Sequence, residues 1–365
     1  MRETALSCGR WEIGMKRAVT IVDVANRAGV SIGTVSNVLN GRVSVREVKR
    51  EAVDKAIRDL GFTPSMIAAG MRKQRSNVIG LCVPFTNFQN FSLIADAVER
   101  ISAAAGYELM QVYSRQDPAI ELERIERLLA FRVGGLILIP STKPGSALDR
   151  LAKSRTPAVI LNRPVEDNRF DEVITDHRQA MNIVVGELIA RGHRKIVLAS
   201  QYPSLSVTRW RVAAMRETVR TSGQQVEVVV LHTGASEETF ARRLAPHFGG
   251  KGPSIALICS NSAVTTWALR TARTRGFHCP ADYSLFALDD PEWADIVVPS
   301  LSVVHQPTEL LAQTAMKRLI ARMDGTATKP ERILISPSVV FRESVSFPNS
   351  ASSSDRRPVS RPASA

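Results

Sequence analysis

The cysteines and histidines are the most reactive side chains of this sequence, and their spacing supports neither a metal site nor a nucleophile. None of the four cysteines (Cys8, Cys82, Cys259 and Cys279) forms a C-x-x-C pair, and no histidine cluster has metal-ligand spacing. No nucleophile elbow, phosphate loop, H-E-x-x-H motif or pair of catalytic carboxylates occurs in a convincing context. We therefore expect no enzyme activity, no cofactor and no metal, with reduced thiols. Six scattered histidines are expected to be structural: His177, His193, His232, His247, His278 and His305.

The composition is that of a globular protein with a basic excess. The chain has 365 residues, 44% of them hydrophobic and 23% charged, which favours two or three domains. The formal net charge of +13 indicates an anionic partner, with nucleic acid first and a membrane surface second. Residues 1–75 carry 14 Lys and Arg against 7 Asp and Glu, so this first part holds about half of the excess.

The sequence predicts no membrane segment. No apolar run approaches 18 residues, and the first 20 residues lack the apolar region of a secretory signal. We expect a cytoplasmic protein, associated with the nucleoid if it binds DNA. Residues 1–18 are interpreted as an N-terminal extension, and Met15 is an alternative start.

Three short helices are predicted next. Residues 20–23 form a capping box, Gly29 provides a tight turn, and Ser31 caps a second helix that runs from Ile32 to about Leu39. Residues 44–47 form a second capping box, which opens a third helix that ends at Leu60 before Gly61. This arrangement predicts a helix-turn-helix, and a small three-helix domain without a DNA role is the alternative. The third helix is expected to bury Val48, Ala52, Ala56, Ile57 and Leu60.

Beyond their spacing, the identities of the residues in this region resemble those of a known protein family. The run VTIVDVANRAGVSIGTVSNVLNG (residues 19–41), continued by LGFTP (residues 60–64), resembles the DNA-binding headpiece of the lactose-repressor (LacI/GalR) family of bacterial regulators. The match is dense and ungapped. It implies a helix-turn-helix headpiece over residues 19–62, whose second helix enters the major groove.

The resemblance also implies which side chains contact DNA. Hydroxyls at Thr20, Ser31, Thr34 and Ser36 suit phosphate contacts, which position the protein without reading sequence. Ile32, Gly33 and Asn37 occupy the base-reading positions of the family, where Asn can bond to adenine and Ile can touch a thymine methyl. The implied DNA-binding set is Thr20, Ser31, Ile32, Gly33, Thr34, Ser36, Asn37, Asn40 and Met71.

Residues 63–75 match the hinge segment of the family, which becomes a minor-groove helix on operator DNA. Met71 stands where the family inserts an apolar side chain into the central base step, and the alternative is a plain linker methionine. Ser65 replaces the usual Asn, and Ala69-Gly70 replaces a polar pair. Gly70 should weaken this helix by about 1 kcal/mol relative to Ala.

From residue 77 onward, apolar strand-like runs alternate with helical patterns. This alternation predicts α/β architecture with two doubly wound parallel sheets, since about 270 residues are too many for one. Nine strands are expected, at 78–83, 108–112, 135–139, 158–161, 173–175, 195–199, 226–231, 255–259 and 284–288. The resemblance implies the same: a two-lobed, periplasmic-binding-protein-like domain over residues 76–347, with an effector in the cleft.

Ligands of open α/β sheets bind at the carboxyl ends of strands, so polar residues just past those ends are the candidates. Arg211, Asn261 and Asp289 match effector-binding positions of the family, Asn162 and Asp176 follow two other strands, and Phe88 and Phe91 could stack on a ring. Ser262 replaces an Asp of the family and Leu288 replaces an aromatic residue. The effector class stays open between a sugar, a sugar phosphate, a nucleoside-like compound or none.

Residues 348–365 are rich in Ser, Pro and Arg and are expected to be disordered. They contain no leucine heptad, which favours a homodimer over a tetramer. The leading hypothesis is a ligand-responsive transcriptional regulator, most simply a repressor, with double-stranded operator DNA and a small molecule as partners and no membrane. The alternatives are a solute-binding protein of the same C-terminal fold, an enzyme on a doubly wound fold, and a regulator that has lost its effector.

Overall fold

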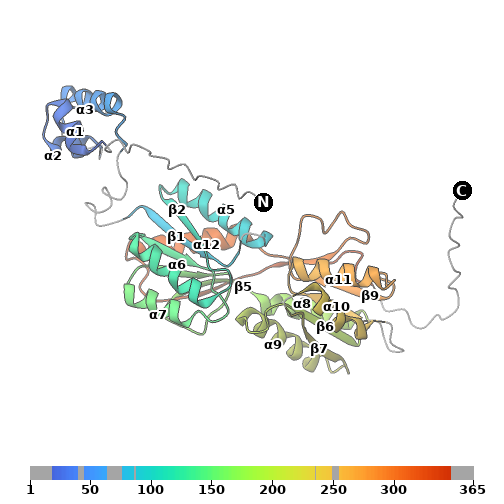
Figure 1. Ribbon diagram of the computed structural model, residues 1–365. Coiled ribbons are helices and arrows are strands. Elements are labelled where there is room, and N and C mark those ends of the chain that lie inside the picture. Colours follow the sequence, from blue (N-terminus) through green and yellow to red (C-terminus); the bar gives the residue numbers. More distant parts are fainter. Residues whose placement is uncertain are drawn as a thin grey trace, which may run out of the picture. The chain divides into compact units, whose positions relative to one another are not determined.

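The computed structural model describes residues 19–39, 45–63, 76–85, 88–234, 236–248 and 255–346. The chain divides into two compact units, one ending at Ser76 and the other beginning at Asn77 (Figure 1). The N-terminal extension, the hinge residues 64–75 and the tail 348–365 lie outside the described residues.

The first unit contains α1 (Ile21–Ala28), α2 (Ile32–Leu39) and α3 (Glu47–Leu60). The predicted capping box of α1 is confirmed, because the Thr20 N–H donates to Asp23 Oδ2 at 2.8 Å and the Asp23 N–H donates to Thr20 Oγ1 at 3.4 Å. Gly29 ends α1 with φ of 66°, the left-handed conformation that the turn requires. The three helices share a core of Val24, Ala25, Val35, Val53 and Ala56.

Two predictions for α3 are wrong. Its N-cap is Arg46, which makes no side-chain capping bond, and the proposed capping residue Ser44 lies outside the described residues. Val48 is 78% exposed instead of buried. Val48 lies in the first turn, about 140° around the helix axis from the buried Val53, so it points away from the core.

The second unit has two six-stranded sheets, each the centre of one lobe. The first sheet has the order β11-β5-β4-β3-β1-β2 and is parallel throughout. The second has the order β12-β10-β9-β8-β6-β7 and is parallel except for β12 against β10. The strands are β1 (Val78–Val83), β2 (Glu108–Tyr113), β3 (Gly135–Leu138), β4 (Ala158–Leu161), β5 (Asp171–Thr175), β6 (Lys195–Ser200), β7 (Glu227–His232), β8 (Ile255–Cys259), β9 (Tyr283–Ala287), β10 (Ser302–His305), β11 (Arg332–Ile335) and β12 (Ser338–Val340).

Helices cover both faces of each sheet, which confirms the doubly wound prediction. In the first lobe, α5 and α12 contribute to one core cluster while α6 and α7 contribute to another. In the second lobe, α10 and α11 share one cluster while α8 and α9 share the other. The helices are α5 (Gln89–Ala104), α6 (Pro118–Ala130), α7 (Gly145–Ser154), α8 (His177–Ala190), α9 (Ser206–Thr221), α10 (Glu237–Leu244), α11 (Ser262–Thr274) and α12 (Thr308–Met323), with a short 3₁₀ helix at Ala245–His247.

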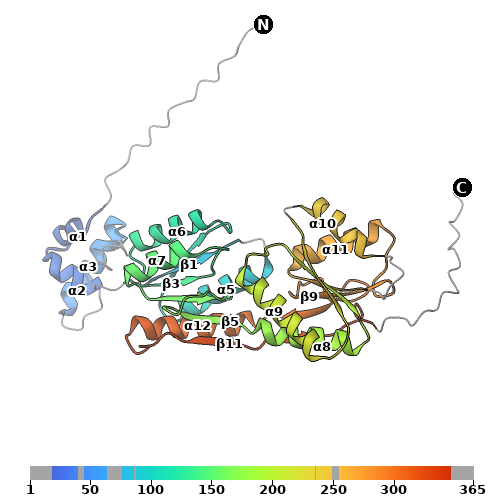
Figure 2. The same cartoon turned by 90° about the horizontal axis from the view of Figure 1, so that it is seen from below.

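The chain crosses between the lobes three times: after β5, after β10, and between β11 and β12. Figure 2 shows α12 and β11, in red, beside the cyan and green elements of the first lobe, and Figure 1 shows α12 beside the same elements. All nine predicted strands are present to within about two residues. Strands β10, β11 and β12 were not predicted; they have four, four and three residues, and β11 and β12 lie where the chain crosses between the lobes.

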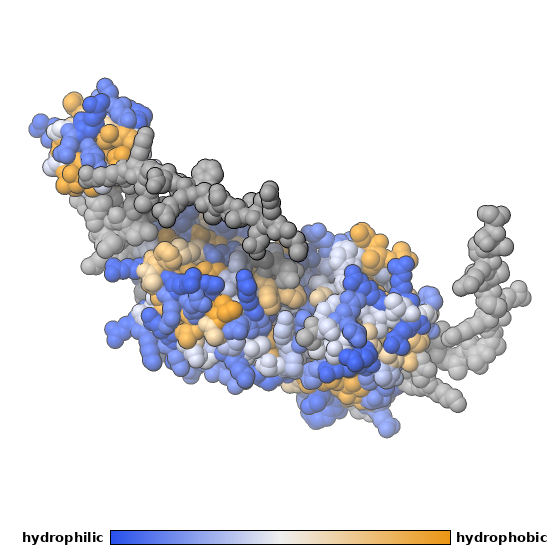
Figure 3. All heavy atoms as spheres, in the orientation of Figure 1, coloured by the Kyte–Doolittle hydropathy of each residue, from blue (hydrophilic) through white to orange (hydrophobic). Residues whose placement is uncertain are grey.

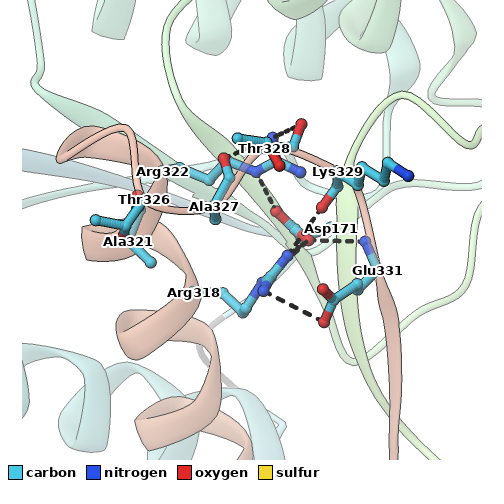
Figure 4. Close-up of polar contacts among 9 residues, drawn as sticks. All are labelled: Asp171, Arg318, Ala321, Arg322, Thr326, Ala327, Thr328, Lys329 and Glu331. Atoms are coloured by element: carbon cyan, nitrogen blue, oxygen red, sulfur yellow. Dashed lines mark hydrogen bonds and ion pairs between the residues drawn. The ribbon is translucent and has the colours of Figure 1, made fainter.

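A buried carboxylate fixes the return of the chain to the first lobe (Figure 4). Asp171, at the start of β5, is fully buried. It accepts hydrogen bonds from Arg318 Nη2 at 2.6 Å, from Arg322 Nε at 2.5 Å and from the Glu331 N–H at 2.8 Å. Burial by itself raises the pKa of Asp171, but the bonds from Arg322 and Arg318 hold it below its ordinary value. The cluster thereby joins α12 and the segment before β11 to β5.

The outer surface of the second unit is mostly hydrophilic on the face drawn in Figure 3, with apolar residues in separate patches. Among the described residues, no helix combines the length and the apolar character that a membrane crossing demands.

We expect Asp171→Ala to lower the free energy of unfolding by about 3 kcal/mol, because it leaves two partly buried guanidinium groups without their carboxylate. Urea denaturation of the full chain measures this change. The matched control is Glu217→Ala, which breaks an ion pair with Arg220 at the exposed surface and should leave the midpoint nearly unchanged. Equal midpoints for the two variants would contradict a role for Asp171 in fastening α12.

Candidate functional site

The N-terminal half of α2 and its capping residue are exposed at the surface of the first unit. Ser31, Ile32 and Gly33 are exposed, with Ile32 at 47%, whereas Val35 is fully buried in the core. The Thr34 N–H donates to Ser31 Oγ at 3.2 Å, which confirms Ser31 as the cap of α2. A Cβ added at Gly33 would meet only Ser31 Oγ, at 3.7 Å, so the backbone there is accessible for close approach.

The other residues predicted to contact DNA are less exposed to solvent or lie outside the described residues. Ser36 and Asn37 are half-buried on α2, and the Thr20 hydroxyl is engaged with Asp23 Oδ2 at 2.7 Å. Asn40 and Met71 lie outside the described residues. Ser31, Ile32, Gly33, Thr34, Ser36 and Asn37 therefore come together on one short helix, as the sequence predicted.

A cavity lies between the two lobes of the second unit, where the carboxyl ends of both sheets meet. Its walls combine aromatic side chains from the first lobe with polar side chains from both. The lining residues are Phe85, Phe88, Asn90, Phe91, Asn162, Arg163, His177, Ser200, Tyr202, Leu205, Val207, Thr208, Arg211, Ser260, Asn261, Asp289 and Gln306.

Six of the seven predicted effector residues line this cavity: Phe88, Phe91, Asn162, Arg211, Asn261 and Asp289. Asp176 does not. Its carboxylate accepts from the Gln179 N–H at 2.9 Å and caps α8. A carboxylate that follows a strand and precedes a helix can satisfy the free N–H groups of that helix, and this capping role explains its position.

The carboxylate of Asp289 is saturated by the protein itself. Oδ1 accepts from Asn90 Nδ2 at 2.8 Å and Gln306 Nε2 at 3.2 Å, while Oδ2 accepts from the Ser262 N–H at 3.2 Å and Ser262 Oγ at 3.3 Å. Burial raises the pKa of Asp289, and Arg211 opposes this shift. Since Asn90 belongs to the first lobe and Asp289 to the second, one of these bonds joins the lobes directly.

Arg211, on α9, is only 6% exposed. Its Nη1 donates to the Ser260 carbonyl at 3.0 Å. Burial lowers the pKa of Arg211 to about 10, with the charge of Asp289 acting in the opposite direction. The guanidinium therefore remains charged at neutral pH.

Arg163 is a second buried cation of the cavity, and the sequence analysis missed it. It is 7% exposed, donates from Nη1 to Gln116 Oε1 at 2.8 Å and to the Pro140 carbonyl at 2.7 Å, and lies 5.1 Å from the ring centroid of Phe91. Burial lowers the pKa of Arg163 to about 10, and Glu121 opposes this shift. The signal was available, because Arg163 follows Asn162 directly past the end of β4.

His177 and Gln306 were also missed as members of the cavity wall. Burial, followed by the nearby charge of Arg211, lowers the pKa of His177 well below its ordinary value, so the ring is neutral at pH 7. Gln306 accepts from Asn162 Nδ2 at 3.2 Å and bonds Asp289, which links the two lobes. Gln306 follows β10, one of the strands that were not predicted.

The lining of the cavity suits the binding of a small molecule. Within the described ranges, no group of three or more His, Cys, Asp or Glu side chains is arranged to hold a metal ion. Cys82 and Cys259 are fully buried, and burial raises the pKa of both thiols. Donors from buried arginines, a neutral histidine and a group of aromatic rings can hold a small molecule and orient it.

A helix-turn-helix unit joined to a two-lobed unit with an interlobe ligand cavity defines a class of DNA-binding regulators. Residues 20–65 match the family of bacterial regulatory proteins named after lacI, and residues 185–345 match a periplasmic binding protein-like domain. The chain thus carries a lacI-family DNA-binding domain and a periplasmic binding protein-like domain, and it is a transcriptional regulator.

Relatives and solved structures of high coverage agree with this assignment. The HTH-type transcriptional regulator KdgR of Bacillus subtilis is 28% identical over 332 residues, which are 89% of this chain and 97% of that protein. The HTH-type transcriptional repressor PurR of Erwinia tasmaniensis is 29% identical over 329 residues, 89% and 96% of the two chains. The lac repressor dimer bound to operator and an anti-inducer has a TM-score of 0.78 at 26% identity, covering 90% of this chain and 99% of that one.

Glu121, on α6 behind Arg163, should make the stability of the folded protein depend on pH. It is fully buried, accepts from the Ser141 N–H at 2.6 Å and Ser141 Oγ at 2.9 Å, and burial raises its pKa to about 7. A raised pKa means that the folded state binds the proton more tightly. Its stabilising contribution is therefore present below the unfolded pKa near 4.3 and is lost as pH rises towards 7.

We expect Glu121→Gln to remove this part of the pH dependence, so that the unfolding midpoint between about pH 5 and pH 8 falls less steeply than in the unsubstituted protein. Thermal unfolding at a series of pH values measures it. Glu123→Gln removes a half-exposed carboxylate of the same helix and should keep the original slope. An unchanged slope in Glu121→Gln would show that the carboxyl does not titrate in this range.

Proposed function

We propose that the protein binds a palindromic operator as a homodimer and that a small-molecule effector in the interlobe cavity controls its affinity for DNA. The observation that carries this proposal is the presence, in one chain, of a lacI-family headpiece and of a cavity lined by two buried arginines. The solved lac repressor is described as a dimer bound to operator and an anti-inducer, which supports the same arrangement here.

At the DNA end, α2 occupies the major groove of each half-site. Exposed Ile32 and Gly33, together with Asn37, read base edges, while the hydroxyls of Ser31, Thr34 and Ser36 contact phosphates. Thr20 and Asn40 complete the contacts of the headpiece, and Met71 in the hinge inserts into the central base step. The basic excess of residues 1–75 strengthens binding to the phosphate backbone and makes it dependent on salt. We place the protein in the cytoplasm, in association with the nucleoid.

At the effector end, the ligand contacts Phe88, Phe91, Asn162, Arg211, Asn261 and Asp289, and Arg163 joins this set. Asp176 is left out because it caps α8. Binding between the lobes changes the contacts that hold them together, such as Asn90 with Asp289, and biases the hinge between two states. The protein acts as a repressor of the genes that it controls.

The experiment that tests the function is a selection of duplex DNA from a random pool by the purified full chain, at about 150 mM salt. We expect a palindrome with a flexible central step. Recovery of no motif, with or without a small-molecule cell extract, would overturn operator binding. Recovery of a motif that no extract alters would favour a regulator that has lost its effector.

Asn37 gives a sharper test of the headpiece. Asn37→Ala should relax the preference at one base position of each half-site and cost about 1–3 kcal/mol there, because the amide no longer bonds a base edge. The matched control is Ser36→Ala, which should weaken all sequences equally. Binding of single-base operator variants measures both, and uniform weakening by Asn37→Ala would assign it to the backbone instead.

A further inference from the structure

We propose that the effector is a small organic anion with an apolar, ring-bearing body. Its carboxylate or phosphate is bound by Arg163 and Arg211, and its body lies against Phe85, Phe88 and Phe91. This inference rests on the proposed function, because it names the ligand class of the same cavity.

The charges of the cavity wall favour an anion. Arg163 and Arg211 are both more than nine-tenths buried, and Asp289 is the single carboxylate among the lining residues. Glu121 stands behind Arg163, outside the lining, where it accepts two hydrogen bonds from Ser141; burial raises its pKa to about 7, so this carboxyl is only partly ionised at neutral pH. Two buried cations against one lining carboxylate and this partly ionised group leave an excess of positive charge in a low-dielectric space, which an anionic ligand would neutralise.

The hydrogen-bonding groups show the same imbalance. Among the described residues, Arg211 and Arg163 bond the protein only through Nη1, so the other N–H groups of both guanidinium forks remain for a ligand. The acceptors of Asp289 are already saturated. A neutral polyol brings a donor with every hydroxyl and needs acceptors in return, whereas an oxyanion needs only donors.

Four helices begin at this cavity, since the first turns of α5, α8 and α9 and the N-cap residue of α11 contribute lining residues. Asp176 caps α8 and Asn261 caps α11. The N-caps of α5 and α9 are the apolar residues Phe88 and Leu205, and neither makes a side-chain capping bond. Two helix N-termini thus present their partial positive charge towards the cavity without a side-chain acceptor, which is favourable for a bound anion.

Ser260 is a second, independent sign of a missing ligand group. It lines the cavity, is only 9% exposed, and its Oγ is buried with no hydrogen-bond partner among the described residues. A buried hydroxyl without a partner is costly, and an oxyanion between the lobes would accept its hydrogen.

The aromatic residues define the body of the ligand. The ring centroids of Phe85 and Phe88 are 5.5 Å apart, those of Phe88 and Phe91 are 6.1 Å apart, and Arg163 packs on Phe91. The three rings form an apolar wall beside the cation. An apolar ring attached to an anionic group would pack on this wall while its charge reaches the arginines.

The test compares ligands that differ in charge and little else. Isothermal titration of the full chain, at matched ionic strength, uses phenylacetate and phenyl phosphate as anions, phenylacetamide as the neutral counterpart of phenylacetate, and glucose as a neutral polyol. We expect at least one anion to bind about tenfold or more tightly than the amide, as a charge-assisted hydrogen bond predicts. The two anions separate a carboxylate ligand from a phosphate ligand. Equal or tighter binding of the amide or glucose, or binding of neither anion, would overturn the inference.

Four substitutions test where the anion binds. Arg211→Met and Arg163→Met should each weaken anion binding about tenfold and leave the amide unaffected, whereas Arg220→Met removes an exposed surface arginine and should change neither. Because a buried Arg→Met change can unfold the chain, Arg211→Lys is measured beside it; it keeps the positive charge but loses the planar fork, and should bind the anion more tightly than Arg211→Met does. Anion binding that persists in both Met variants would place the anion elsewhere and contradict the assignment.

The DNA selection keeps the two proposals distinguishable. An operator motif that responds to cell extract, together with failure of both anions, leaves the regulator function standing and removes only the anionic class. Absence of any operator motif, together with anion binding that depends on Arg211, removes the DNA function and leaves the ligand class.

Discussion

The direction of the strands is the constraint on which the ligand cavity depends. In a parallel sheet the carboxyl ends of neighbouring strands lie at the same edge, and here those edges of two sheets face each other across the cleft. Residues far apart in sequence are brought within hydrogen-bond distance for this reason: Asn90 and Asp289 are 199 residues apart and bond at 2.8 Å. The strand ends and the polar residues that follow them are β4 with Asn162 and Arg163, β6 with Ser200, β8 with Ser260 and Asn261, β9 with Asp289, and β10 with Gln306.

The lobes are firmly built, and the contacts that join them are few and polar. Each lobe has two apolar clusters around its sheet, and Asp171 fastens the returning α12 to the first lobe through two arginines. Across the cleft, Arg209 pairs with Glu166 at 2.8 Å, and the guanidinium of Arg332 lies 5.5 Å from the ring centroid of Trp210. Rigid lobes joined by exchangeable polar contacts suit a change in their relative position when a ligand enters.

Burial in the cavity and the charges of its wall shift the pKa values of several lining residues. Burial lowers the pKa of Arg163 and Arg211, yet both stay far enough above 7 to remain charged, and the two cations help to keep His177 neutral. Asp289 balances part of this positive charge, but its oxygens already accept hydrogen bonds from amide and hydroxyl donors of both lobes. The same carboxylate thereby helps to hold the lobes together and leaves the arginines for a ligand.

The sequence by itself determined the helix-turn-helix, the capping of α1 and α2, the nine main strands, and six of the seven cavity residues that were named. The helices and strands follow from local signals: a capping side chain, a Gly turn and apolar periodicity. Asn162 follows from the rule that ligand residues lie past strand ends, whereas Phe88, Phe91, Arg211, Asn261 and Asp289 were named from the resemblance to the lactose-repressor family. Only the tertiary structure decided which polar residues past a strand end enter the cavity. Asp176 turns to cap its own helix, while Arg163 and Gln306 enter the cavity wall. That choice depends on how the opposite lobe faces each strand end, and three chain crossings that leave no local pattern in the sequence set this geometry.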